Sequence, residues 1–525
     1  MKKLLSMVTL LLLFVGVGWG EMKSSISQYG ITWTFDKSYE CGQFVNGDWW
    51  VKGPATVKSV SPAPYSDRNG SQVNPVPGKQ GFDNRGYLSY HYQASVRVSF
   101  PLVLQVNQSL VSTISHPTGE VTDLRGVVCK GKVYPVQTAA VLTCLAAAAP
   151  AGTYRPPYIG NTKPLYNISQ IKWDKLPTLD TVPGVPTDRA YYTRGMQRVW
   201  LDHLPDWSGN YLHPAENMLG YHREVYNFIN SVAMLVMLDI PERESLAKQF
   251  IQIGIDHAYI SMLGDGSSAQ CMWQILFAGI MLDEPEIYNM FKEGRNKSIF
   301  KTTQRVYVGN GWSGAKVLFR NGGASHNYEH VHPSQWLDTN IFANSGGGCK
   351  EEAYRHCCNS AGWPSLALAA ILMDAKDLWN YDPFFDYVER WMNEDLTEPN
   401  KVIEQHCGKS YGSGRTTGSP WRDFLWKFNR YASAPIVQPA APVKNNTPGF
   451  ILSANPLVKG TDLVISVVHS GMIQVIISDM NGTVVEHLAG ENMLFWNTGQ
   501  VNPGMYFIST DDGSYFSPVL VVDKK

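Results

Sequence analysis

The spacing of hydrophobic and polar residues changes character along the chain. Between residues 31 and 146, apolar and polar positions alternate in short segments such as 94–100 and 102–106, and Gly, Pro, Asn and Ser separate these segments. Alternation indicates half-buried strands, and the separating residues favour turns. We therefore expect residues 21–152 to form an N-terminal β-sandwich-like region, with Trp49 and Trp50 facing its core.

A helical period replaces the alternation from about residue 188 to residue 431. Val225, Phe228, Ile229, Val232 and Leu235 recur at the spacing of one helix face. The same period predicts helices within residues 246–258, 273–282, 366–378 and 384–392. Successive helices joined by polar loops predict a mainly α fold over residues 153–432, an α-hairpin array or an (α/α) toroid, and not a parallel α/β sheet.

The remaining segment returns to strand patterning. A Pro- and Ala-rich stretch predicts a linker over residues 433–448. Apolar segments at 463–468, 473–477 and 504–509 then predict a small C-terminal β-sandwich over residues 449–525.

The N-terminus and the charge balance bear on where the protein acts. Lys2 and Lys3 precede an apolar run at residues 4–17 and small residues after it, the pattern of a signal peptide over residues 1–20. We therefore expect a secreted or cell-surface protein with no membrane span, because no later segment is long and apolar enough. The 44 Lys and Arg residues balance 45 Asp and Glu residues, so charge gives no reason to expect a nucleic-acid partner.

Eight cysteines are compatible with disulfides in an exported protein. Cys129 and Cys144 flank an expected strand pair and are the best candidates for a bridge. Adjacent Cys357 and Cys358 do not easily bond each other, so we expect their partners among other cysteines, with Cys349 and Cys407 as candidates.

Candidate chemistry concentrates in two polar clusters of the helical region. Seven of the 13 histidines fall between positions 203 and 332. The segment 320–333 brings together Arg320, His326, Tyr328, His330 and His332 within a Gly-rich stretch that ends in Pro. The upstream cluster holds Asp202, His203, Tyr211, His213, Glu216, Asn217, Tyr221, His222, Arg223 and Glu224. Phenol and imidazole groups transfer protons, while Arg and Asn stabilise a carboxylate and its enolate-like intermediate, so the mixture favours proton abstraction beside a carboxylate.

Two parts of the chain resemble known families. The tail resembles the C-terminal sorting domain of the type IX secretion system, on Asn455-Pro, the segment from Asp479 and the segment from Gly504, which implies the secretion machinery as a partner. The body resembles exported alginate and glucuronan lyases with an (α/α)-toroid domain. The matching segments are 39–50, 155–158, 212–217, 274–279, 328–330 and 384–391.

The lyase resemblance implies roles for particular residues. A uronate-containing acidic polysaccharide would be cleaved by β-elimination without a cofactor. Tyr328 would be the proton donor, Asn217 and Arg320 would neutralise the substrate carboxylate, and His326 or His330 would be the base. We expect the substrate to contact His213, Glu216, His222, Arg223, Gln270 and Trp336.

One departure from the lyase pattern leaves alternatives open. Residues 264–271 stand where relatives carry a Gly-Gly-His-Gly-type loop, so another histidine or Tyr328 itself must serve as base, or the substrate differs. A glycoside hydrolase would instead use two carboxylates, one of them protonated. Its candidates are Asp206, Glu216, Glu329 and Asp338. The order His326-x-x-Glu329-His330 also matches inverted zinc peptidases, although the flanking Gly and Pro leave little room for a helix. A non-catalytic glycan-binding surface protein is the remaining alternative.

Overall fold

The computed structural model divides the chain into two compact units, residues 1–437 and 438–525. It describes residues 20–85, 89–117, 120–122, 124, 128–130, 134–205, 207–220, 222–263, 272–322, 327–342, 346–430, 450–452, 457–467, 473–479, 483–490, 493–510 and 516–522. The segments expected to be a signal peptide and a Pro-rich linker lie almost entirely outside these residues. Among the helices described here, none has both the length and the apolarity needed to cross a membrane.

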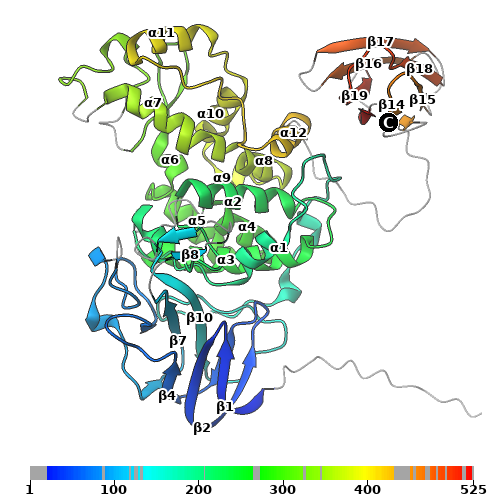
Figure 1. The fold of residues 1–525 in the computed structure, drawn as a ribbon. Coiled ribbons are helices and arrows are strands. Elements are labelled where there is room, and N and C mark those ends of the chain that lie inside the picture. Colours follow the sequence, from blue (N-terminus) through cyan, green and yellow to red (C-terminus); the bar gives the residue numbers. More distant parts are fainter. Residues whose placement is uncertain are drawn as a thin grey trace, which may run out of the picture. The chain divides into compact units, whose positions relative to one another are not determined.

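The first unit opens with an eight-stranded mixed sheet (Figure 1). The strand order is β5-β7-β10-β3-β2-β4-β6, with β1 paired to β2, and β10 and β3 run parallel. The strands are β1 (Glu21–Gln28), β2 (Ile31–Gln43), β3 (Trp49–Lys52), β4 (Ala55–Ser61), β5 (Ser71–Val73), β6 (Leu102–Leu104), β7 (Gln108–Ser115) and β10 (Val136–Leu145). A separate hairpin pairs β8 (Glu120–Thr122) with β9 (Val128–Lys130).

Both faces of this sheet are apolar, and the two-residue period of β10 shows why. Ala140, Leu142 and Cys144 belong to a core formed by the sheet's own strands. The alternate residues Ala139 and Val141 belong to a second core. That second core also contains Val199, Leu201, Leu204, Leu212 and, from a helix, Ile260. Successive side chains of a strand point to opposite faces, so one strand contributes to both cores and joins the sheet to the helical part.

The helical part of the first unit contains twelve α-helices within the described residues. They are α1 (Ala190–Gln197), α2 (His222–Leu235), α3 (Arg243–Leu263), α4 (Met272–Leu282), α5 (Pro285–Asn296), α6 (Lys301–Arg305), α7 (Gly347–Cys358), α8 (Pro364–Leu372), α9 (Lys376–Trp379), α10 (Asp382–Asn393), α11 (Thr397–Cys407) and α12 (Pro420–Asn429). Helices α3, α4 and α5 pack on one another, and α2 packs on α8. A short hairpin of β11 (Val306–Val308) and β12 (Val317–Phe319) packs on α10.

The expected mainly α toroid is wrong. The chain is 36% helical and 25% strand, with several sheets, one of them a large mixed half-barrel. The individual helices at residues 222–235, 243–263, 272–282 and 382–393 do lie where the helical period predicts them. Periodicity reports which face of a segment is buried, but it carries no information on whether successive helices close into a ring. Here the sheet and the helices form one compact unit, and no boundary separates them near residue 152.

The C-terminal unit is all β in its described residues. Strands β13 (Phe450–Leu452), β15 (Asp462–Val467) and β18 (Met493–Asn497) form one sheet. Strands β14 (Leu457–Val458), β20 (Phe516–Val522), β19 (Gly504–Thr510), β16 (Ile473–Asp479) and β17 (Val484–Gly490) form the other. Leu463, Trp496, Ile508 and Val519 share a core, so residues from both sheets pack together, in keeping with the sandwich expected from the sequence.

The cysteine pairings differ from those expected. Cys349 bonds Cys407, and Cys357 bonds its neighbour Cys358. Cys144 is a buried free thiol, so the expected bridge from Cys129 to Cys144 is wrong. Cys144 lies in β10, within the core of the sheet, where a buried thiol packs as a small hydrophobic group.

Candidate functional site

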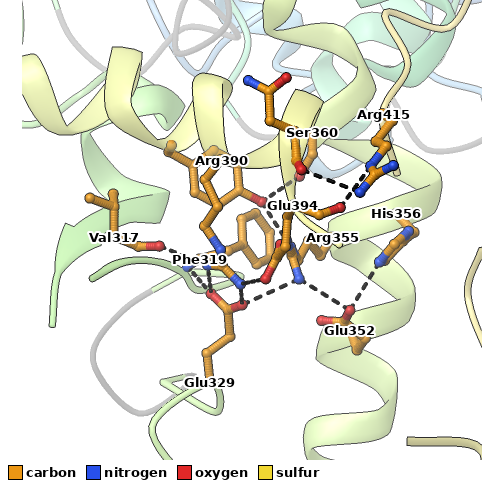
Figure 2. A network of polar contacts seen from close by, with 12 residues as sticks. Val317, Phe319, Glu329, Glu352, Arg355, His356, Ser360, Arg390, Glu394 and Arg415 are labelled. Carbon is orange, nitrogen blue, oxygen red and sulfur yellow. Dashed lines mark hydrogen bonds and ion pairs between the residues drawn. The ribbon is translucent and has the colours of Figure 1, made fainter. Parts of the chain in front are cut away.

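Tyr328 bonds Glu352, a member of the buried polar network of α7 and α10 residues that Figure 2 shows. Its hydroxyl donates to Glu352 Oε2, and the side chain is fully buried. Burial, followed by the negative charges of Glu352 and Glu329, raises the pKa of Tyr328 well above its ordinary value. The phenol therefore holds its proton in this state, and its expected role as proton donor stays a prediction.

Two guanidinium groups hold the carboxylates of this network together. Arg355 lies 3.3 Å from both Glu329 and Glu352, and donates to Glu394 Oε2 at 2.6 Å. Arg390 donates to Glu329 Oε1 at 2.7 Å and to Glu394 Oε1 at 2.9 Å. Figure 2 shows these side chains converging from α7, α10 and the segment around Glu329. These mutual ion pairs stabilise the packing of the elements, and each charged group is paired with an opposite charge.

Glu352 is the carboxylate that links Tyr328, Arg355 and His356 in this network. It accepts hydrogen bonds from Tyr328 and Arg355, and its Oε1 lies 2.9 Å from His356 Nε2. Burial alone would raise the pKa of Glu352, but Arg355 and His356 together lower it to about 2. The group is therefore ionised at neutral pH.

Of the other residues expected at a site around Tyr328, Trp336 packs edge-to-face on the phenol ring, with the two ring centroids 5.2 Å apart. Arg320 donates from Nε to the carbonyl oxygen of Gln304 at 2.7 Å and stacks on the Tyr307 ring. His330 is exposed, and Trp336 is buried with its Nε1 donating to the Val331 carbonyl. His326 and Gln270 lie outside the described residues. In the part of the chain that the structure describes, no hydrogen bond joins Asn217 to Arg320, Tyr328 or His330.

Glu329 does not have the surroundings of a zinc-site residue. Its carboxylate accepts from Arg390, and from the backbone N–H of Phe319. A carboxylate held by two arginines is a structural anion, which disfavours the peptidase interpretation of the His326-x-x-Glu329-His330 order.

The upstream cluster forms a second buried centre around Asp202. His213 Nε2 lies 2.7 Å from Asp202 Oδ1, and His257 Nε2 lies 2.9 Å from Asp202 Oδ2. Asn210 donates to Oδ1 from its amide at 3.0 Å. The ring of Trp200 packs beside both imidazoles. One carboxylate therefore orients two histidines.

The hydrogen bonds assign protons to these imidazoles. His213 Nδ1 faces the carbonyl oxygen of Leu219 at 2.8 Å, and its Nε2 faces Asp202. Both partners only accept, so we infer that His213 donates from both nitrogens. His257 donates from Nε2, which leaves Nδ1 without a proton in its neutral ring. Burial opposes the charge of Asp202, but His213 and His257 hold its pKa well below the ordinary value.

Two amide side chains are buried without partners on segments next to this centre, the loop after His213 and helix α4, which packs on α3. Asn217 lies in the loop between His213 and Leu219, and neither of its amide atoms has a hydrogen-bond partner among the described residues. Gln274, in the first turn of α4, is in the same condition. A Cβ at Gly254 of α3 would lie 2.1 Å from the Gln274 carbonyl oxygen, so the two helices touch one turn from His257. Buried amides without partners are rare, because each lost hydrogen bond is costly.

The remaining expected contacts are structural or exposed. Glu216 accepts from Gln137 at 2.7 Å and from Arg198 at 2.9 Å. Arg223 is exposed and pairs with Glu224. His222 begins α2, and its side chain lies outside the described part.

His257 is the functional candidate that the sequence did not single out. It lies in α3, where residues 250–261 are buried on every side, so no polar face marks it. Asp256 and His257 stand together within this apolar run, and two titratable residues in a fully buried helix were the available signal. His203, the neighbour of Asp202 in the same cluster, does not complete the centre, because its ring bonds the Tyr158 hydroxyl at 3.1 Å.

No family model, curated protein or solved structure matches the chain. The assignment of function therefore rests on the residues of the chain and their geometry.

Proposed function

We propose that the chain is a polysaccharide lyase that cleaves a uronate-containing glycan by β-elimination at the centre around Asp202. One observation supports this proposal above the others: a single buried carboxylate orients two imidazoles, and the loop after one of them, His213, carries the buried amide of Asn217, which has no partner among the described residues. β-Elimination requires a group that transfers a proton and hydrogen-bond donors that bind the substrate carboxylate.

The proposed steps keep the hydrogen bonds that join Asp202 to His213 and His257. The amides of Asn217 and Gln274 donate to the uronate carboxylate and stabilise the charge that spreads onto it. His257 Nδ1 removes the C5 proton, the C4–C5 double bond forms, and the C4–O bond breaks. The departing oxygen then takes a proton from the imidazolium of His257. Asp202 fixes the ring orientation and stabilises the charged imidazole, and the already protonated His213 balances the carboxylate.

The hydrolase alternative is less well supported by the described carboxylates. A hydrolase requires one carboxylic acid that stays protonated next to an ionised partner. Glu216 and Glu329 each accept hydrogen bonds from an arginine, so both carboxylates are already paired within the protein. Asp338 is exposed and accepts from a backbone N–H of Asn340. Asp206 lies outside the described residues.

The first experiment is a product assay on the purified full chain. Alginate, glucuronan, pectate and glycosaminoglycans would be offered separately, and the unsaturated uronate product would be followed by its ultraviolet absorbance. We expect this product from at least one polymer. New reducing ends without the unsaturated product would establish a hydrolase, and neither signal from any polymer would contradict an enzymatic function on these substrates.

Variants then locate the site. His257→Ala should lower kcat by about 10²–10⁴-fold, the usual contribution of a positioned acid or base. His487→Ala is the matched control, because this histidine is exposed in the other unit. Tyr328→Phe discriminates the two buried centres: near-normal turnover is expected. Loss of turnover in Tyr328→Phe with activity kept in His257→Ala would place the reaction at the Glu352 network instead.

A further inference from the structure

The two disulfides of the first unit differ in what they hold together. Cys349–Cys407 joins the first turn of α7 to the last residue of α11, across 58 positions of sequence. Cys357–Cys358 joins sequence neighbours at the end of α7. A crosslink stabilises a fold by closing a loop in the unfolded chain, and a bond between neighbours closes almost none. The Cys357–Cys358 bond therefore contributes little to the free energy of unfolding.

The two disulfides also differ in how accessible they are. Cys357 is exposed and Cys358 is half-buried, whereas Cys349 is only 8% exposed and Cys407 is half-buried, so the exposed sulfur belongs to the Cys357–Cys358 pair. The free thiols Cys41 and Cys144 are buried. Thiol–disulfide exchange requires in-line approach of a thiolate to one sulfur, so access decides which bond reacts. Among the described cysteines, Cys357 is the sulfur that an external thiol reaches most directly.

The position of the pair connects it to the network around Glu352. His356, the residue before the pair, bonds Glu352, and its ring packs on Trp391. Asn359, the residue after the pair, accepts from Arg305 and donates to the Tyr354 carbonyl at 2.7 Å. The disulfide ring thus fixes the backbone between two anchored residues. Opening the ring would release only the last turn of α7.

We propose that Cys357–Cys358 is a selective thiol–disulfide exchange site, which small thiols open by reduction while Cys349–Cys407 stays intact. The thiolate of a low-molecular-weight thiol attacks one sulfur of the pair, forms a mixed disulfide and releases the other cysteine as a thiol. A second small thiol then attacks the mixed disulfide. The pair is reduced to two thiols, and two small thiols are oxidised to one disulfide. The reduced pair is a vicinal dithiol, which binds a trivalent arsenical through both sulfurs.

The test follows thiols in the native full chain during graded reduction. Aliquots treated with rising dithiothreitol would be alkylated, digested and mapped by mass spectrometry. We expect Cys357 and Cys358 to be labelled together at reductant concentrations at least tenfold below those that expose Cys349 and Cys407. After mild reduction and removal of the reductant, phenylarsine oxide should bind one equivalent and block the labelling of both residues.

Matched variants make the result decisive. In Cys357→Ser/Cys358→Ser, the early thiols and the arsenical binding should disappear, while the behaviour of Cys349 and Cys407 is unchanged. In Cys349→Ser/Cys407→Ser, the early thiols should remain. Labelling of Cys357 and Cys358 before any reductant is added would show that no bond joins them, and release of all four thiols together would show no selectivity. Either result overturns the proposal.

Discussion

The guanidinium of Arg155 offers the sharpest test of how the sheet and the helices are held together. The side chain is fully buried, and its Nε donates to Asp48 Oδ2 at 2.5 Å. Its Nη1 donates to Asp256 Oδ1 at 2.9 Å and to the Pro156 carbonyl at 2.8 Å. Asp48 precedes β3 and Asp256 lies in α3, so one cation joins the two layers.

Replacing this cation with an apolar side chain should be strongly destabilising. Arg155→Met leaves two buried carboxylates without their shared partner. Breaking a buried pair costs about 3–5 kcal/mol, which corresponds to roughly 10²–10⁴-fold in the unfolding equilibrium. In the variant, protonation of Asp48 removes part of the cost of leaving two charged carboxylates buried. Burial already raises the pKa of Asp48, despite the opposing charge of Arg155. We therefore expect the loss to stay within about 3–5 kcal/mol at pH 7.

Denaturant unfolding followed by tryptophan fluorescence measures this loss in the first unit. Arg223→Met is the matched control, since this arginine is exposed and pairs with Glu224; its change should be under about 1 kcal/mol. The deficit of Arg155→Met should shrink as the pH falls towards 4, because the stranded carboxylates become protonated. A variant within about 1 kcal/mol of the parent at every pH would refute the reasoning.

Two further predictions concern pH. Folding lowers the pKa of Glu352 from its ordinary value of 4.5 to about 2. This group therefore stabilises the fold above pH 4.5 and loses that contribution as the pH falls towards 2. Glu352→Gln should therefore be less stable than the parent at pH 7 by about 3 kcal/mol, and urea unfolding at pH 3 should show a smaller gap; an equal gap at both values would contradict this. Burial lowers the pKa of His203 from 6.5 to about 3, so its neutral form stabilises the fold above pH 6.5 and the parent loses this contribution between pH 6.5 and 3. His203→Gln should lose less stability over that interval in thermal or urea unfolding, and parallel pH curves would refute the assignment.

The local sequence patterns predicted local secondary structure well, but they could not predict contacts between residues that are distant in the sequence. Helix α2 and helix α4 lie where the helical period places them, because a helix buries its face through residues within a few turns. The segment 94–100 shows the limit: it alternates like a strand but contains a short 3-10 helix at Ala94–Val96. Val98 bonds the Ser71 carbonyl, and a Cβ at Gly81 would lie 2.9 Å from Arg97 N, so packing against a distant loop decides its shape.

The candidate site shows the same limit in its side chains. The cluster at residues 202–224 was recognisable from its polar density, but the partners of Asp202 were not. Asp202 and His203 are neighbours that bond different groups, because adjacent side chains of non-helical, extended chain point to opposite sides. The partner of Asp202 that completes the centre, His257, lies 55 residues further along the chain. Only the packing of α3 brings it there.

Helix α3 connects the stability of the molecule with its proposed chemistry. Asp256 bonds Arg155, and the next residue, His257, bonds Asp202. Consecutive residues of a helix project about 100° apart, so the two networks grip α3 from different sides. The Arg155 network therefore fixes how α3, which carries the proposed base, is rotated about its axis and where it lies along that axis. A base displaced by even a fraction of an ångström loses its alignment with the C–H bond that it must break. Burying Arg155 with two carboxylates carries a desolvation penalty. The network that offsets this penalty also holds His257 in position.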